Sequence, residues 1–205
     1  MLLEMEKDLQ IVGEAEDGRQ AVALVKKLRP AVVLMDIAMP LLNGLEATRQ
    51  IRKDFPDTKV LILSAHSHVA FVKQVTELGA AGFLLKQTSS AVVATAIREV
   101  QKGNTFFSPA IARSLSAGDP KSLNREGQPK KKSNHLSSRE VEVLQLIAEG
   151  QGNKQVAAEL GLSFKTVDKY RQQLMSKLNI HDVASLTRYA IAEGIIESND
   201  RGIID

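Results

Sequence analysis

The chain has 205 residues, enough for one large domain or two of ordinary size, and its 43% hydrophobic and 25% charged residues are typical of a globular protein. It has no cysteine, which excludes disulfides and thiol catalysis, and no apolar run reaches the roughly 18 residues that a membrane-spanning helix needs. The acidic N-terminus also lacks the basic and then apolar pattern of a secretory signal, so we expect a cytoplasmic protein.

The first half of the chain alternates short β-branched runs with helical patterns. This alternation is typical of βα units around a parallel sheet, and the near-continuous apolar runs indicate strands that are buried on both faces. Strands are predicted at Leu9–Gly13, Ala31–Leu34, Lys59–Leu63 and Gly82–Leu85, and helices at Arg19–Leu28, Leu45–Asp54, Val69–Leu78 and Ala91–Lys102. Residues 1–115 are therefore assigned to one α/β domain.

Residues 116–135 are predicted to be a flexible linker, because periodicity disappears there and Gly, Pro, Ser, Asn and Lys dominate. The net charge of +3 is concentrated in this region, where residues 121–135 contain five Lys or Arg against one acid. Residues 136–205 contain eight against ten. Charge alone therefore does not identify a nucleic-acid-binding segment.

Residues 136–198 show helical spacing throughout. Ser137-Ser138-Arg139-Glu140 has the spacing of a capping box, Gly161 is suited to end a helix, and Ser163 is suited to cap the next. Helices are predicted from about Ser138, around Val156–Leu160, at Phe164–Leu178 and at Val183–Glu193. The C-terminal segment is thus predicted to be an all-α domain of four helices.

Three reactive side chains follow three of the predicted strands. Asp36 comes after an apolar strand, Ser64 follows the next, and Lys86 follows the one after it. The carboxyl ends of parallel strands meet at one edge of a sheet, where ligands bind. A carboxylate that accepts a phosphoryl group is assisted by a divalent cation, a lysine and a hydroxyl donor. The pattern therefore predicts a phospho-acceptor site at Asp36.

These residues also carry a family resemblance. Val32-Val33-Leu34-Met35-Asp36-Ile37-Ala38-Met39-Pro40 with Asn43-Gly44, then Ser64-Ala65 and Gly79–Lys86, resemble the receiver domain of two-component response regulators. The resemblance implies a flavodoxin-like α/β fold in which Asp36 is phosphorylated, Ser64 turns toward the phosphoryl group and Lys86 pairs with it. It further implies that Phe83 repacks on activation, and that Asp36 and the backbone carbonyl of Ala38 help to hold Mg²⁺.

The sequence departs from the receiver pattern at its start. The family pattern begins with a strand that ends in two adjacent acids, which hold Mg²⁺, and no such strand precedes Leu9. Met1–Met5 read as the end of a first helix, so we expect the domain to lack roughly 20 residues and the true start codon to lie upstream. Without the acid pair, Mg²⁺ binding and phosphate uptake are expected to be weak. Glu16-Asp17 follows the second strand and is not assigned the metal role.

Residues 136–196 resemble the LuxR-type helix-turn-helix of the NarL/FixJ class of response regulators. The residues that carry this resemblance are Leu136–Leu144, Gly150, Asn153–Ala157, Leu160, Ser163, Lys165–Val167 and Lys177-Leu178. Gly152, Asp168 and Tyr170 depart from the usual serine, lysine and histidine. These departures affect base contacts more than the fold.

The third predicted helix has an apolar face of Val167, Leu174 and Leu178 and an opposite polar face. A helix-turn-helix inserts the N-terminal part of such a helix in the major groove. Base contacts are predicted for Lys165, Asp168, Lys169 and Gln172, and phosphate contacts for Lys154, Thr166, Arg171 and Lys177. By resemblance, part of the fourth helix forms a dimer contact.

The sequence is interpreted as a DNA-binding transcriptional regulator of a two-component phosphorelay, controlled by phosphorylation of Asp36 and not an enzyme. Its expected partners are double-stranded DNA, a sensor histidine kinase and a second copy on DNA, and RNA polymerase is a further partner that this function allows. The main alternative is a phosphorylation-independent regulator with a degenerate receiver. An aspartate-based phosphatase is disfavoured because Ala38 stands where it needs a second acid, and a kinase-sequestering module is disfavoured by the helix-turn-helix.

Overall fold

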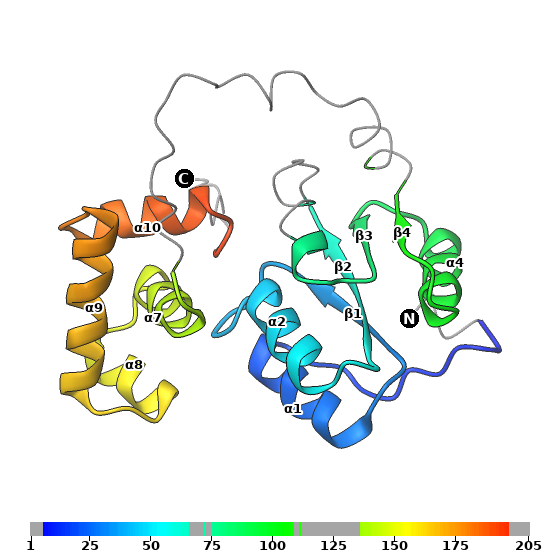
Figure 1. Cartoon of the computed structure of the whole chain (residues 1–205), viewed down its shortest axis with the longest axis horizontal. Helices are drawn as coiled ribbons and strands as arrows, with labels where there is room; N and C mark the ends of the chain where they lie inside the picture. The colour runs from blue at the N-terminus through cyan, green and yellow to red at the C-terminus, as the bar shows by residue number, and fades with distance from the viewer. Residues whose placement is uncertain (1–5, 66–71, 73–74, 109–110, 112–135, 197–205) are drawn as a thin grey trace, which may run out of the picture.

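The computed structural model describes residues 6–65, 72, 75–108, 111 and 136–196. They form a domain with a parallel sheet and a separate helical domain, which lie side by side (Figure 1). None of the helices in these ranges is long and apolar enough to cross a membrane. The predicted linker lies outside the described residues.

The sheet contains β1 (Val32–Asp36), β2 (Lys59–Ser64), β3 (Gly82–Leu85) and β4 (Phe106–Phe107) in chain order, and all neighbouring pairs are parallel. The register pairs Asp36 with Leu63 and Ser64 with Leu85. The strand ends that carry the reactive residues therefore lie at one edge of the sheet, as predicted.

Both faces of the sheet are covered. Met35, Ile62 and Phe83 share a buried cluster with residues of α1 (Gly18–Leu28) and α2 (Gly44–Asp54). Leu61 and Leu84 point to the opposite face and pack against α4 (Ser90–Gln101). The alternation of side chains along a strand explains why consecutive apolar residues of β2 enter two different clusters.

The strand predicted at Leu9–Gly13 is wrong: these residues form no strand, and Ile11 and Val12 are 38% and 49% exposed. β propensity reflects the fit of a side chain to a half-buried pleated surface, and this segment has no ladder with β1, whose described partner is β2 alone. The residues just before this segment are held to the domain by ion pairs instead. Arg98 of α4 pairs with Glu6 and Asp8, and the hydrogen bond from its guanidinium lowers the pKa of Asp8 to about 2.

The other predicted elements of this domain are largely confirmed. α1, α2, α4, β1, β2 and β3 lie within a residue or two of their predicted bounds. Of the helix predicted at Val69–Leu78, residues 72 and 75–77 are helical, and the others up to residue 74 lie outside the described residues. The sequence analysis missed β4, which is only two residues long.

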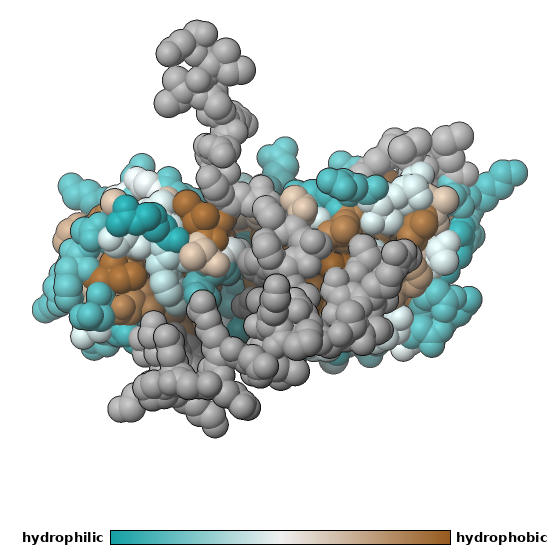
Figure 2. All heavy atoms as spheres, turned by 90° about the horizontal axis from the view of Figure 1, so that it is seen from above, coloured by the Kyte–Doolittle hydropathy of each residue, from teal (hydrophilic) through white to brown (hydrophobic). Residues whose placement is uncertain are grey.

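The helical domain consists of α7 (Ser138–Ala148), α8 (Asn153–Leu160), α9 (Phe164–Leu178) and α10 (Val183–Ala192). Its core is separate and contains, among others, Leu144, Val156, Val167, Leu174 and Leu186. Seen from above, apolar atoms are visible on both domains, to the left and right of the central grey atoms, with polar atoms around them (Figure 2). The capping box of Ser137 and Glu140 and the left-handed Gly161 are present as predicted.

Candidate functional site

The acceptor candidate Asp36 lies at the carboxyl edge of the sheet beside Lys86. The Lys86 Nζ is 2.8 Å from Asp36 Oδ2, and the backbone N–H of Ala38 donates to Asp36 Oδ1 over 3.3 Å. The Asp36 side chain is 33% exposed. A carboxylate that is oriented by a cation and an amide, yet open to solvent, can reach a phosphoryl donor.

The other two predicted receiver residues adjoin this pair. Ser64 ends β2 and is 4% exposed, and its carbonyl accepts a hydrogen bond from the Lys86 N–H over 2.8 Å. Phe83 lies in β3 and is fully buried in the cluster shared with α1 and α2. The structure thus brings Asp36, Ser64 and Lys86 to one edge of the sheet and places Phe83 beneath them in the core.

The described residues do not fit a Mg²⁺ site. Mg²⁺ prefers octahedral oxygen ligands that include carboxylates, and no group of three His, Cys, Asp or Glu that could hold a metal occurs among the described residues. Asp17 caps α1 and accepts from the backbone and side chain of Gln20 at 2.8 and 2.7 Å. Asp36 and the Ala38 carbonyl therefore remain the only predicted ligands in the described part of the chain.

The loop between Asp36 and α2 contacts the helical domain, which the sequence analysis did not anticipate. Gln145 of α7 is fully buried, accepts from the Asn43 N–H over 2.8 Å and donates to the Met39 carbonyl over 2.9 Å. In the sequence, its position inside the apolar run from Val143 to Ile147 indicates a buried polar side chain that needs a partner. Beside it, Arg19 of α1 forms ion pairs with Glu142 of α7 and Glu159 of α8.

Two carboxyl groups, the buried Glu46 and the more exposed Glu149, flank this junction between the domains. Desolvation raises the pKa of Glu46, which is 3% exposed and faces Ser138 of α7. Desolvation also raises the pKa of Glu149, whose carboxylate accepts from the Leu41 N–H and the Gln145 side chain. The junction therefore combines an apolar contact with two acids that release their protons less readily than in water.

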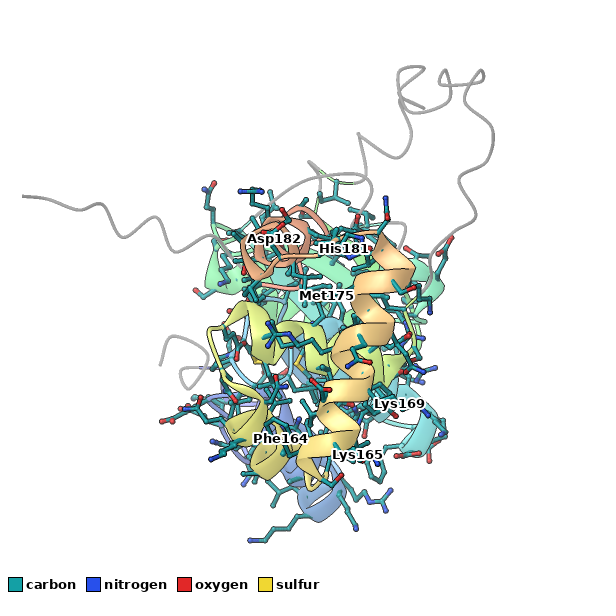
Figure 3. All side chains as sticks on the ribbon, turned by 90° about the vertical axis from the view of Figure 1, so that its left-hand side faces the viewer. Phe164, Lys165, Lys169, Met175, His181 and Asp182 are labelled. Carbon is teal, nitrogen blue, oxygen red and sulfur yellow. The ribbon has the colours of Figure 1, made fainter. Side chains whose placement is uncertain are left out.

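α9 presents its polar face away from the sheet domain. Lys165, Lys169 and Gln172 are exposed on it, and Val167 and Leu174 are fully buried on the other side. Figure 3 shows Lys165 and Lys169 toward the viewer, on the side of the molecule opposite the sheet. Lys154 of the neighbouring α8 is exposed as well. This surface can approach a large anionic partner.

The remaining predicted contact residues are partly buried and already have partners. Asp168 accepts from Gln172 over 2.9 Å and Arg171 donates to Asn153 over 3.1 Å, so these side chains form a network between α8 and α9. The Thr166 hydroxyl shares a hydrogen bond with Ser163. The Lys177 Nζ lies 2.9 Å from Glu140 Oε2 in α7, farther along the helix than the exposed lysines.

Phe164 was missed by the sequence analysis. It is the first residue of α9 and is 53% exposed, beside Lys165 (Figure 3). An aromatic residue directly after the Ser163 cap, at the first position of the helix, was the signal. An exposed aromatic ring among cationic side chains suits contact with a surface that has apolar and anionic groups.

Two families match the sequence. Residues 1–98 match the family described as "Response regulator receiver domain", and residues 134–190 match "Bacterial regulatory proteins, luxR family". The two matches correspond to the sheet domain and to the helical domain.

Regulatory proteins of several bacteria are similar over nearly the whole chain. The oxygen regulatory protein NreC of Staphylococcus carnosus is 36% identical, with 96% of this chain and 92% of that protein covered. The response regulator UvrY of Escherichia coli is 36% identical (95% and 87% covered), and the transcriptional regulatory protein DegU of Brevibacillus brevis is 34% identical (96% and 88% covered).

Solved structures are similar as well. The RcsB response regulator of Salmonella typhimurium is 27% identical with a TM-score of 0.52, and 93% of this chain and 89% of that chain are covered. A structure of two RcsB dimers bound to two parallel DNAs is 28% identical with a TM-score of 0.52, covering 91% and 87%.

Proposed function

The chain belongs to the two-component response regulators in which a receiver domain is joined to a LuxR-type helix-turn-helix domain, and from this premise we propose that Asp36 is its phosphate acceptor and that α9 reads DNA. The observation that carries the proposal for the acceptor is the 2.8 Å pair of Asp36 and Lys86 at the carboxyl edge of the sheet. A sensor histidine kinase is the proposed donor.

In the proposed transfer, an Asp36 oxygen attacks the phosphorus of a phosphohistidine or a small acyl phosphate, and the leaving group keeps the electron pair of the broken bond. The product is an aspartyl phosphate. The Lys86 ammonium, already beside Asp36 Oδ2, offsets charge on the phosphoryl oxygens. We propose that the Ser64 hydroxyl, at the end of the adjacent strand, turns to donate to one of them.

Intact-protein mass spectrometry after treatment with acetyl phosphate tests the acceptor. We expect part of the wild-type protein to gain the mass of one phosphate, because uptake is weak without the acid pair, and Asp36→Ala to gain none. Asp57→Ala, which removes an exposed aspartate at the opposite end of β2, is the matched control and should behave like the wild type. A phosphate that persists in Asp36→Ala would contradict the proposal.

For DNA, we assign base contacts to Lys165, Lys169 and Gln172 and phosphate contacts to Lys154 and Arg171. Lysine prefers guanine or phosphate, glutamine can pair with adenine, and an apolar side chain such as Phe164 contacts the thymine methyl group. The exposure of Lys154, Lys165, Lys169 and Gln172 supports this role, and Arg171 lies partly buried between them and Asn153 of α8. The half-buried Asp168 and Thr166 are proposed to orient these contacts, and Lys177 to reach phosphate at the end of the site.

Selection from a random duplex library, followed by affinity measurements at several salt concentrations, tests this assignment. Lys169→Ala should cost about 1–3 kcal/mol and relax base preference at one position, whereas Lys154→Ala should weaken binding to all sequences and lower the salt slope by about 1. Lys53→Ala, an exposed lysine of α2, is the matched control and should change neither. Equal effects of all three variants would refute the assignment.

A second copy on DNA is proposed to bind through α10. Val183 and Ile191 of this helix are 39% and 37% exposed, whereas Leu186 and Ala190 fill the domain's own core. Paired helix-turn-helix domains match two half-sites one helical turn apart. Mutation of both exposed residues to Ser should lower the cooperativity of binding to a paired site without changing binding to a single half-site.

The second candidate function is a DNA-binding regulator that does not depend on phosphorylation. The poor fit of the described residues to Mg²⁺ favours it, because the divalent cation assists phosphoryl transfer in such sites. The two functions differ in one measurement: phosphodonor treatment changes DNA affinity in the first and leaves it unchanged in the second.

A further inference from the structure

The loop that follows the acceptor, residues 37–43, is held from two sides. On the sheet side, the Gly44 N–H donates to the Ile37 carbonyl over 2.8 Å, and Ile37 and Leu42 are 6% and 2% exposed in the core of the receiver. The loop is also tied to the acceptor, since the Ala38 N–H donates to Asp36. Any shift of this loop therefore changes the surroundings of the acceptor carboxylate.

On its other side, the loop is held mainly by the side chain of Gln145, from the DNA-binding domain. Gln145 accepts from the Asn43 N–H and donates to the Met39 carbonyl, and its second N–H donates to Glu149 over 2.7 Å. The carboxamide thus uses its oxygen and both N–H groups while it is fully buried. A buried polar group with all its partners satisfied fixes one arrangement, because any slip leaves a buried donor or acceptor unpaired.

Leu41 in the same loop adds a second link. Its φ of 63° lies in the left-handed region, which a bulky side chain rarely adopts and which persists only where the surroundings hold it. Its side chain packs against the core of the helical domain, and its N–H donates to Glu149 over 3.4 Å. The backbone of the acceptor loop is thus held in an unusual conformation by contacts from the helical domain.

We propose that Gln145 is a positioning residue for the acceptor site: the DNA-binding domain, docked through α7, holds the Met39 carbonyl and the Asn43 amide, and so sets the rate at which Asp36 accepts phosphate. The inference rests on the proposed function of Asp36. α7 lies between the receiver and α9, so this docking leaves Lys165 and Lys169 exposed (Figure 1). The contact acts on the acceptor and does not cover the DNA-reading face.

The experiment compares the initial rate of phosphate incorporation from acetyl phosphate in the full chain and in two variants. Gln145→Met keeps the length and the apolar stem but makes none of the three hydrogen bonds, whereas Gln173→Ala changes an exposed glutamine of α9 and is the matched control. We expect Gln145→Met to be at least 3-fold slower and Gln173→Ala to match the wild type. Hydrogen exchange at the Asn43 amide should become faster only in Gln145→Met.

Each outcome decides between the proposals. If the wild type takes no phosphate, the proposed function of Asp36 is overturned. If the wild type takes phosphate and Gln145→Met does so at an equal or higher rate, the positioning role is overturned and the acceptor role stands. If Gln145→Met does not fold, judged by circular dichroism, Leu41→Ala removes the packing from the loop side and is held to the same 3-fold criterion.

Discussion

Gly44, the first residue of α2, packs tightly against the backbone of the proposed acceptor Asp36. A Cβ added there would overlap the carbonyl of Asp36, and one added to Gly18 would overlap the carbonyl of Leu42. These are backbone atoms of the segment that carries the acceptor, so they cannot yield as a flexible side chain does. The two glycines let α1 and α2 approach the acceptor loop, where Asn43 caps α2 by accepting from the Glu46 N–H.

Gly44→Ala should therefore destabilise the receiver by about 3 kcal/mol, since overpacking against backbone forces the loop and α2 apart. Gly152→Ala is the matched control, because its added Cβ meets only the side chain of Gln155 at 3.6 Å, and it should cost less than about 1 kcal/mol. Differential scanning calorimetry of the full chain measures both. Equal unfolding temperatures of the two variants would show that the close approach of Gly44 to the Asp36 carbonyl does not constrain the fold.

Among the elements, α7 contributes to the core of the helical domain and also contacts the receiver domain. Ser137 and Glu140 form its capping box, with the Ser137 N–H donating to Glu140 Oε2 over 2.7 Å. The same carboxylate pairs with Lys177 of α9. The start of α7 is thus linked to the end of α9.

Ser137→Ala should lower the free energy of unfolding of the helical domain by about 1 kcal/mol, because the Glu140 N–H loses its capping acceptor. Ser176→Ala, on the exposed side of α9, is the control and should be neutral or slightly stabilising, since alanine is the better helix former. Thermal unfolding followed by far-UV circular dichroism measures the difference. A loss in the control as large as in Ser137→Ala would contradict the role of the cap.

At the scale of the whole molecule, the two domains are joined by a junction whose charge depends on pH. Desolvation raises the pKa of Glu46 and of Glu149 above the ordinary 4.5. The groups that face Glu46 are Arg49, Gln50, Ser138 and Glu142. The groups that face Glu149 are Gln145, Leu41, Arg19 and Glu159. When the domains separate, water restores the ordinary values. The docked state therefore binds protons more readily than the separated state.

Docking should accordingly strengthen as pH falls from the raised pKa values toward 4.5, and weaken as pH rises through them. The chain has no cysteine, so spin labels placed by Lys53→Cys and Ser176→Cys report the distance between the domains. The docked population should be larger near pH 4.5 than at pH 7. In the Glu46→Gln, Glu149→Gln double variant it should stay constant, and a dependence that survives there would assign it to other groups.

Local sequence patterns were sufficient to locate most of the elements and the order of the reactive residues. Apolar runs located β1, β2 and β3 and thereby placed Asp36, Ser64 and Lys86 at one edge, and the Ser137, Gly161 and Ser163 signals located the helix ends. These features depend on local periodicity and capping, which are properties of neighbouring residues. The proposed roles of the site residues remain predictions.

Features that depend on partners distant in sequence could not be predicted and became visible in the structure. Leu9–Gly13 has β-branched residues but no ladder, and the short β4 is a strand only because β3 pairs with it. Likewise, nothing local shows that Gln145 meets the Asn43 amide 102 positions earlier, or that Lys177 pairs with Glu140. Strand pairing and domain docking are contacts between segments that chain folding brings together, so their energies are absent from any short window of sequence.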